Sequence, residues 1–313
     1  MPRTAGTGVT GRLDAIVYRA GTSAPFYVSE HESSFARGDD ISSCLDNLSG
    51  QVRQDVSDGV YPPPEKHIIR TFVTTVEAPL DLRDGRRAQP FICRVDEVAG
   101  HRGRRSFEAQ CPTNYLRESG RTMHDAMKGL AEVISARYEG ESVTDLMREL
   151  PKRPIMTSFI LSGRPDGRWA QAAVQRKDGR YEAFALAAPV SVQGRSPLEA
   201  LERLESRLAG RGLEKAVSSR GEPAFCTMDV PLHLRENISI RRFFVAVSRY
   251  RGRGSPFYAA CAPQAGISVR APTFDGALDG ARDAIALEFR EKSGGDMKRM
   301  LREMPMLTAA KIA

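Results

Sequence analysis

An internal repeat constrains the fold of this chain more than any other feature. The segment 105–111 (RSFEAQC) resembles 255–261 (SPFYAAC), 150 residues later. The segment 145–151 (DLMRELP) resembles 299–305 (RMLREMP), 154 residues later. A repeat of this length predicts a chain built from copies of one supersecondary unit.

Two looser matches, 24–29 and 180–185, extend the pattern to four segments. In each, an aromatic residue opens an expected strand and a helix-capping residue follows. The aromatic residues are Phe26, Phe107, Tyr181 and Phe257, spaced by 81, 74 and 76 residues, and the capping residues are Asp40, Thr122, Ser196 and Thr273, spaced by 82, 74 and 77. Because two landmarks keep nearly the same spacing, we expect four units, the first resembling the third and the second resembling the fourth.

Each unit has the pattern of two or three strands, a further short strand and a helix. Segments such as 13–18 and 243–247 show the alternation or short apolar runs of strands, and apolar stripes at helical spacing follow the caps. We expect extra strands at 67–77, 155–162 and 225–234, and short helices at 143–150 and 296–304. The predicted fold class is α+β, with four tandem ββ(β)βα units in two related halves and helices packed on antiparallel sheets.

The repeat also sets the expected boundaries. We expect a flexible arm over 1–12, unit 1 over 13–60, unit 2 over 67–151, unit 3 over 153–218, unit 4 over 224–305 and a tail over 306–313. The Pro-rich run YPPP at 61–64 has the composition of a rigid linker between units 1 and 2. Units of this size bury little surface alone, so they should pair sheet to sheet or edge to edge.

The first unit resembles a known family. Its sequence, LDAIVYRAGTSAPFYVSEHESSFARGDDISSCLDNLSGQV followed by SDGVYPPPE, is similar to a HicB-type antitoxin domain, and the later units match it through FEAQCP, YEAFALAAPVSV and FYAACAP with the helices that follow. The resemblance implies a degenerate RNase H-like fold without nuclease carboxylates, which binds a small ribonuclease toxin. The ββββα order of the later units also resembles the PUR and Whirly single-strand-binding folds in topology.

Sequence motifs of catalysis are absent from the chain. It has no CxxC, HExxH, GxxxxGK[ST] or GxSxG motif, and its five histidines are scattered. The strand carboxylates Asp14, Asp96 and Glu97 do not recur between units, as a divalent-metal nuclease built on this repeat would require. We therefore expect a protein that is not an enzyme, with no catalytic residues, no metal site and no cofactor.

Composition indicates the compartment. The five cysteines are odd in number and widely spaced, as in a cytoplasmic protein with reduced, buried thiols. No apolar stretch is long enough to cross a membrane, and the first residues lack the apolar core of a signal peptide. We expect no membrane partner.

Positive charge is concentrated in two segments. The chain has a net charge of +7, and 38 of its 46 cationic residues are arginine, the side chain best suited to phosphate contacts. Segment 83–105 carries a net +4 and segment 235–253 a net +5, and each contains a Gly/Arg-rich turn. The predicted nucleic-acid-binding residues, which include a weaker group in unit 3, are Arg83, Arg86, Arg87, His101, Arg102, Arg104, Arg105, Arg176, Lys177, Arg241, Arg242, Arg249, Tyr250, Arg251 and Arg253.

These residues favour non-catalytic binding of RNA or single-stranded DNA through the arginine-rich hairpins of units 2 and 4. Arginines on turns can reach phosphates, and the rings of His101 and Tyr250 could stack on unpaired bases. One alternative is an antitoxin-like scaffold that sequesters a small protein partner, and another is a divalent-metal nuclease. Sheet edges could also support a homo-oligomer.

Overall fold

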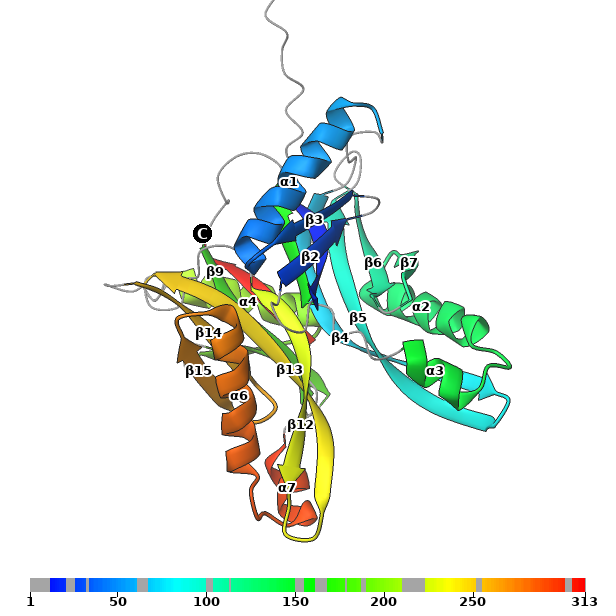
Figure 1. Ribbon diagram of the computed structural model, residues 1–313, viewed down its shortest axis with the longest axis vertical. Helices are drawn as coiled ribbons and strands as arrows, with labels where there is room; N and C mark the ends of the chain where they lie inside the picture. Colours follow the sequence, from blue (N-terminus) through cyan, green and yellow to red (C-terminus); the bar gives the residue numbers. More distant parts are fainter. Residues whose placement is uncertain are drawn as a thin grey trace, which may run out of the picture.

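The computed structural model confirms a mixed α+β fold with antiparallel sheets (Figure 1). It describes residues 12–20, 26–31, 34–60, 67–99, 104–112, 114–149, 155–160, 168–177, 179–186, 190–209, 223–251, 255–301 and 306–312. The predicted flexible arm therefore lies almost entirely outside the described residues, as does the linker at 61–64. None of the helices in the described part of the chain has the length and apolar character needed to cross a membrane.

The chain runs twice through the same order of elements. The first half contains β1 (Arg12–Ala20), β2 (Phe26–His31), β3 (Ser34–Gly38), α1 (Ile41–Ser57), β4 (His67–Leu82), β5 (Gly85–Ala99), β6 (Arg105–Cys111), β7 (Leu116–Gly120), α2 (Met123–Arg137), α3 (Val143–Glu149) and β8 (Ile155–Ile160). The second half contains β9 (Arg168–Lys177), β10 (Arg180–Ala185), β11 (Ser191–Gly194), α4 (Pro197–Ala209), β12 (Ala224–His233), β13 (Ile238–Arg251), β14 (Pro256–Ala262), β15 (Ile267–Ala271), α6 (Phe274–Glu288), α7 (Gly294–Met300) and β16 (Met306–Ile312).

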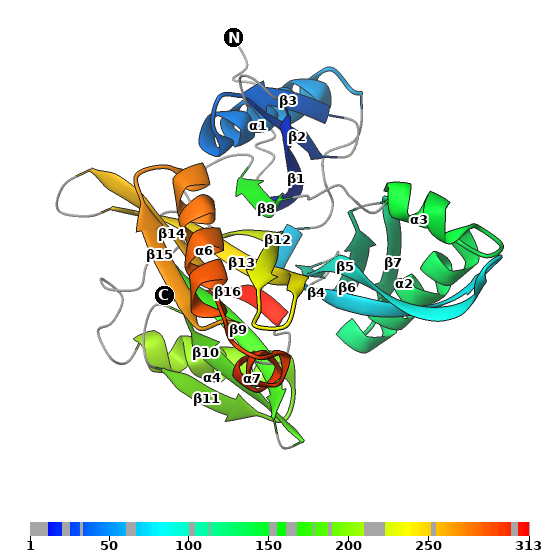
Figure 2. The same ribbon diagram turned by 60° about the horizontal axis from the view of Figure 1, so that its bottom comes forward.

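Each sheet takes strands from both halves (Figure 2). Sheet A has the order β15-β14-β13-β12-β8-β1-β2-β3, and sheet B has the order β11-β10-β9-β16-β4-β5-β6-β7. In both sheets, a four-stranded group from one half is joined to a three-stranded group from the other through β8 or β16. Strands of the predicted units 1 and 4 thus share sheet A, and strands of the predicted units 2 and 3 share sheet B.

Two segments were assigned wrongly from the sequence, one to a tail and the other to unit 3. The residues after 305 were expected to form a tail, but they form β16, which pairs with β9 and β4 at the centre of sheet B. The strand predicted at 155–162 was assigned to unit 3, but β8 pairs with β1 in sheet A. The reason is non-local: β16 buries Leu307 and Thr308 completely and satisfies backbone groups of two strands that are otherwise edges.

Three of the four strand–helix corners share one geometry. Gly38, Gly120 and Gly194 end β3, β7 and β11, and a Cβ atom at these positions would lie 2.3, 2.5 and 2.4 Å from the backbone nitrogen of the residue six positions on. The first turn of the helix therefore packs directly on the strand end, where only glycine fits closely. At the fourth corner, Ala271 ends β15, and Gly276 lies in the helix that follows.

The strand register corrects the predicted aromatic landmarks. The residues directly opposite the ends of the four short strands are Tyr27, Phe107, Tyr181 and Tyr258, so Phe26 and Phe257 are each one position away. Successive strand residues point to opposite faces. The sequence match of Cys111 with Cys261 therefore fails as well, because the match is one residue out of register.

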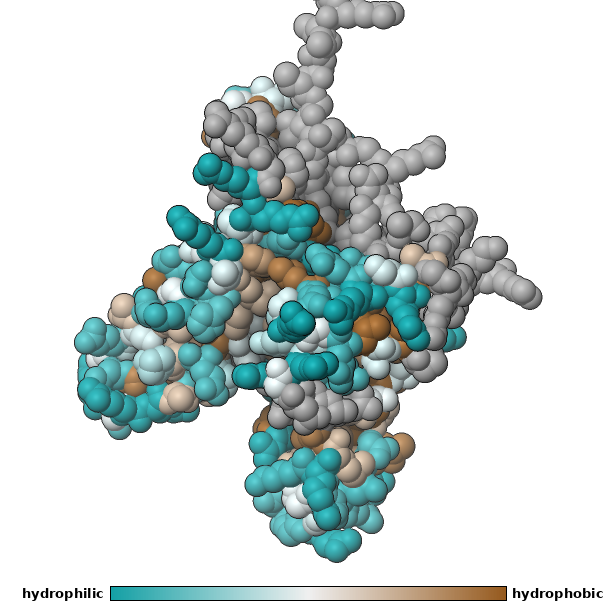
Figure 3. Space-filling view, turned by 180° about the vertical axis from the view of Figure 1, so that it is seen from behind, coloured by the Kyte–Doolittle hydropathy of each residue, from teal (hydrophilic) through white to brown (hydrophobic). Residues whose placement is uncertain are grey.

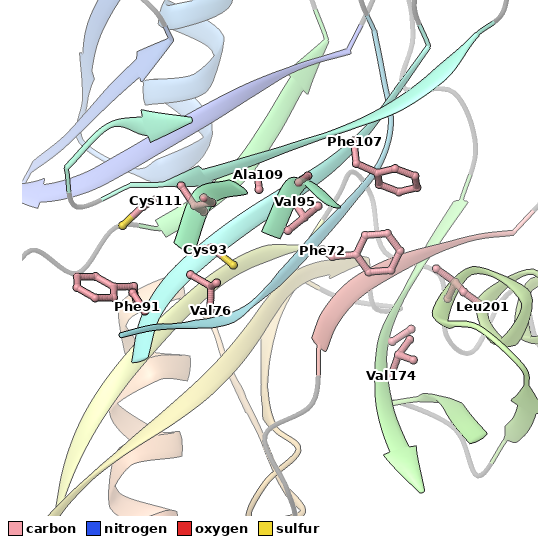
Figure 4. Close-up of a cluster of buried hydrophobic side chains, with 14 of the residues drawn as sticks. Phe72, Val76, Phe91, Cys93, Val95, Phe107, Ala109, Cys111, Val174 and Leu201 are labelled. Atoms are coloured by element: carbon pink, nitrogen blue, oxygen red, sulfur yellow. The ribbon is translucent and has the colours of Figure 1, made fainter. Parts of the chain in front are cut away.

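The helices cover the outer faces of the sheets, and the inner faces meet. Helices α2 and α4 share one core on sheet B (Figure 4), and α6 and the start of α1 share another on sheet A. The inner faces meet through Val73, Ala173 and Leu307 of sheet B and Phe225, Phe244 and Ala246 of sheet A. All five cysteines are free and buried, as predicted.

Candidate nucleic-acid interface

The structure separates the two ends of each predicted cationic segment. Arg83, Arg86 and Arg87 lie at the β4–β5 turn, whereas Arg104 and Arg105 lie where β6 begins. These groups are at opposite ends of β5, whose 15 residues span about 45 Å. In the same way, β13 places Arg241 and Arg242 toward one end and Arg249 and Arg251 at the other.

At the outer ends of these hairpins, acidic partners offset part of the positive charge. The Arg86 guanidinium donates to Asp81 at 3.1 Å, and Arg242 donates to Asp229 at 2.8 and 3.3 Å. Asp84 accepts from the N–H of Val143 at the start of α3. The matching carboxylate of the other hairpin, Glu236, accepts from the N–H of Gly294 at the start of α7. These ends combine exposed arginines with structural carboxylates.

The β5–β6 turn is connected to the neighbouring unit by ion pairs. Arg104 is exposed, and Arg105 donates to Glu97 at 2.9 Å. The Glu97 side chain is only 1% exposed and also pairs with Arg70, which reaches Glu205 of α4 at 3.0 Å. This chain of charges links Arg105 to α4 through Arg70 of β4. His101 and Arg102 lie outside the described residues.

At the end of β13 that leads into β14, the ring of Tyr250 is buried, whereas the sequence predicted that it would be free to stack on a base. Tyr250 is 9% exposed, and its ring stacks on Phe257 with centroids 5.5 Å apart. Burial raises the pKa of Tyr250 to about 12. The prediction that Tyr250 offers a ring to a base was therefore wrong: the even-numbered side chains of this part of β13 enter the layer between the sheets. The side chains of Arg251 and Lys177, and all of Arg253, lie outside the described set.

The strand ends beside the two arginine-rich turns lie apart. Figures 1 and 2 place the end of β5 and the end of β13 on different sides of the molecule. The reason is that β5 and β13 belong to different sheets. A single face of the molecule therefore does not connect the two strand ends, so one ligand would not contact both by following that face.

Unit 3 brings arginines together more closely than the sequence indicated. Arg180 at the start of β10, Arg195 after β11 and Arg203 on α4 line a hollow of about 140 Å³ with Gln193 and Gly194. We call these three arginines the arginine corner. Arg180 and Arg195 are exposed and form no ion pair with another described residue.

Sequence reasoning found Arg176 and Lys177 in this unit and missed the arginine corner. One signal was available. Arg195 directly follows Gly194 of a repeated corner and precedes the helix cap Ser196, whose side chain accepts from the N–H of Glu199. The convergence of Arg180 and Arg203 on this position depends on the folded strands.

The arginine corner includes Arg203 of α4, and a chain of ion pairs from Arg105 through Glu97 and Arg70 ends at Glu205 of the same helix. Arg203 and Glu205 are two residues apart, so they point to opposite flanks of α4: Arg203 reaches β11, and Glu205 reaches Arg70 of β4. Figure 3 shows hydrophilic side chains gathered on the face opposite that of Figure 1, over the region where α4 lies. The described arginines of the β5–β6 turn, the β9–β10 hairpin and the arginine corner are Arg104, Arg105, Arg176, Arg180, Arg195 and Arg203.

Comparisons with known proteins add no relative: no protein-family model, curated protein or solved structure matches this chain. The resemblance to HicB-type domains therefore rests on the sequence segments alone. Among the residues that the structure describes, no three His, Cys, Asp or Glu side chains are grouped so that they could hold a metal ion.

Proposed function

We propose that this protein binds RNA or single-stranded DNA without catalysing a reaction, and that the backbone phosphates contact the α4 side of sheet B. The observation that supports this proposal is the arginine corner on one flank of α4, together with the ion-pair chain that links Arg105 to Glu205 on the other flank. This surface replaces the pair of hairpins that the sequence favoured. Only one of those hairpins contributes to it.

The binding would depend mainly on phosphate neutralisation. Of the six described arginines on this surface, Arg105 and Arg203 already have carboxylate partners, which leaves four. Each phosphate neutralised on a single strand contributes about −0.7 to the slope of log affinity against log salt, so we expect a slope of about −2 to −3, depending on whether two arginines share a phosphate. Because phosphate contacts carry no sequence information, discrimination between base sequences should be weak.

Fluorescence anisotropy with labelled uridine RNA and thymidine DNA of about 20 nucleotides, across a salt series, tests this function. The variant Arg104→Glu/Arg195→Glu should bind the probes much more weakly than the unmodified chain does. A matched control, Arg86→Glu/Arg242→Glu, makes the same charge change at the outer hairpin ends and should bind nearly as well as the unmodified chain. No binding at low salt, or equal losses in both variants, would contradict the proposal.

We also propose that the fold arose from one unit by two duplications. Asn47 and Arg203 hold matching positions on their helices and donate to the carbonyls of Arg37 and Gln193, at 2.7 and 2.8 Å. The same helix position is glycine in the other two units. A Cβ on Gly129 would contact the Glu118 side chain, and one on Gly280 would contact Val269. These positions support a pairing of the first unit with the third and of the second with the fourth.

A second candidate function is binding of a small protein, as HicB-like ancestry would imply. One observation favours it: Ile238 and Ile240 of β13 are 64% and 71% exposed. The matching positions of β5 hold Arg86 and Ala88. Purification of the tagged protein from its host, followed by identification of what elutes with it, separates the two functions. A stoichiometric protein without nucleic acid would favour the second.

A further inference from the structure

The arginine corner is absent from the other three strand–helix corners. At the position of Arg195, directly after the strand end, the other units have Asp39, Arg121 and Pro272. At the position of Arg203, eight residues further along each chain segment, they have Asn47, Gly129 and Gly280. Unit 3 alone combines arginine at both positions, on a glycine corner that it shares with units 1 and 2. The cations therefore are an addition to the corner and not a requirement of its geometry.

Arg203 is held in place before any ligand arrives. Its guanidinium donates to the carbonyl of Gln193 at 2.8 Å and to the carboxylate of Glu199 at 2.5 Å. Glu199 also accepts from the backbone N–H of Arg195 at 2.7 Å, which fixes the chain on the other side of the hollow. A binding group that is already ordered loses less conformational entropy when a ligand binds.

The charge of the hollow is positive. Three arginines, Arg180, Arg195 and Arg203, line it, and Glu199 is the carboxylate paired with one of them. The volume of about 140 Å³ corresponds to roughly four or five waters at about 30 Å³ each. That is room for one tetrahedral oxyanion and some water, and too little for a stacked base pair.

We infer that the arginine corner seats a single backbone phosphate of the bound nucleic acid. This inference rests on the function proposed above and makes it more specific. Arg180 and Arg195 would each offer the planar fork of N–H donors that matches two phosphate oxygens, and Arg203 would add charge from its fixed position. The corner would thereby set where the strand enters the α4 surface.

Anisotropy with the uridine RNA probe tests the inference with two substitution pairs. Arg180→Glu/Arg195→Glu should lower affinity by about tenfold or more, and it should reduce the salt slope by about 0.7 for the lost phosphate. The matched control Arg121→Glu/Arg290→Glu makes the same charge change at exposed sites, one of them the equivalent corner of unit 2. Its affinity should stay within about twofold of the unmodified chain, because it removes no phosphate contact.

A pair of substitutions that conserves charge distinguishes a phosphate bound by the guanidinium groups from one attracted only by the positive charge of the surface. Arg180→Lys/Arg195→Lys keeps the charge and removes the fork, so it should bind several-fold more weakly than the unmodified chain. If this lysine variant binds as tightly as the unmodified chain, the inferred phosphate site is wrong, and the proposed nucleic-acid binding still stands. Equal losses in the glutamate pair and its control would also overturn it.

If the unmodified chain binds neither RNA nor DNA, the proposed function fails, and inorganic phosphate tests the hollow directly. Saturable changes in the ¹⁵N shifts of the Arg180 and Arg195 Nε atoms would support an oxyanion seat. Unchanged shifts would overturn it. Thermal unfolding of every variant checks that the exposed substitutions leave the fold intact.

Discussion

The two halves of this chain have the same order of elements, yet neither half builds a sheet from its own strands alone. Residues 12–160 supply β1–β3 and β8 to sheet A and β4–β7 to sheet B, and residues 168–312 do the reverse. The comparison shows that the strands and the strand–helix corners form within each half. The two sheets, in contrast, are complete only when strands of the two halves pair. Changes at matched positions can therefore show what each half contributes.

Matched positions differ most in the layer between the sheets. Val95 lies opposite Ala109, and Val247 lies opposite Ala260, which aligns β5 with β13. By this alignment, Arg94 and Asp96 of the first half correspond to Ala246 and Ser248 of the second. The first half has an ion pair where the second has two small side chains.

The largest effect is expected from breaking this ion pair. Arg94 is 0% exposed, donates to Asp96 at 2.6 Å and donates to Thr71 at 3.1 Å. The variant Arg94→Ala leaves a buried carboxylate without its cation and should lower the free energy of unfolding by about 3–5 kcal/mol. The double variant Arg94→Ala/Asp96→Ser copies the second half and should recover part of that loss. Urea unfolding measures both, and a double variant less stable than the single would refute this reading of the pair.

The glycine corners give the next largest effect. Gly120→Ala and Gly194→Ala place a methyl group against backbone atoms of the following helix and should each cost about 1–3 kcal/mol. Gly50→Ala serves as the control. It lies within α1 with nothing within 4 Å of an added Cβ, so it should stabilise the protein by about 0.5–1 kcal/mol. Neutral corner variants would show that the shared corner tolerates a side chain.

The corners and strands were predictable from sequence because their signals are local. Capping residues, apolar periodicity and glycines lie within one segment, and the predicted helix starts at Asp40, Thr122 and Thr273 are confirmed as N-caps. The pairing of β8 with β1 and β12, and of β16 with β9 and β4, was not predictable, because the sequence of a strand does not indicate which distant strand it pairs with. The register failed because tyrosine follows phenylalanine in two units, and either residue satisfies the pattern.

The candidate site was predictable only in part, for the same reason. Arg104 and Arg105 belong to one Gly/Arg-rich turn, which a sequence displays directly. The arginine corner draws on β10, α4 and the residue after β11, which are brought together by folding. The burial of Tyr250 depends on the face that β13 turns to the other sheet, and an alternating strand pattern alone does not assign that face to solvent or core.

Alkaline pH should destabilise the protein through thiols that differ between the halves. Cys93 lies opposite Thr74, and Cys226 lies opposite Val245, so each half has one cysteine on the same rung but in different strands. Burial raises the pKa of Cys93, and it raises the pKa of Cys226 to about 12. The stability due to each neutral thiol is fully present below its unfolded pKa of about 8.5.

Above that pH, the unfolded state loses its proton first, and stability should fall by up to about 1.4 kcal/mol per pH unit for each thiol, until the folded pKa is reached. Cys93→Val copies Val245 of the second half and should reduce the slope measured by urea unfolding between about pH 9 and pH 11. A slope unchanged in Cys93→Val would mean that other groups cause the alkaline loss.

The smallest effect concerns the two short helices, which are tied to their hairpins in the same way. Asp84 accepts from the N–H of Val143 at 2.9 Å, and Glu236 accepts from the N–H of Gly294 at 3.1 Å. Asp84→Ala or Glu236→Ala should cost about 0.5–1 kcal/mol each, because an N–H group at a helix start loses its partner. The two contacts lie in different sheets and share no residue, so the losses should add in the double variant. A double variant that loses clearly more than the sum in chemical denaturation would reveal coupling between the two hairpins through the layer where the sheets meet.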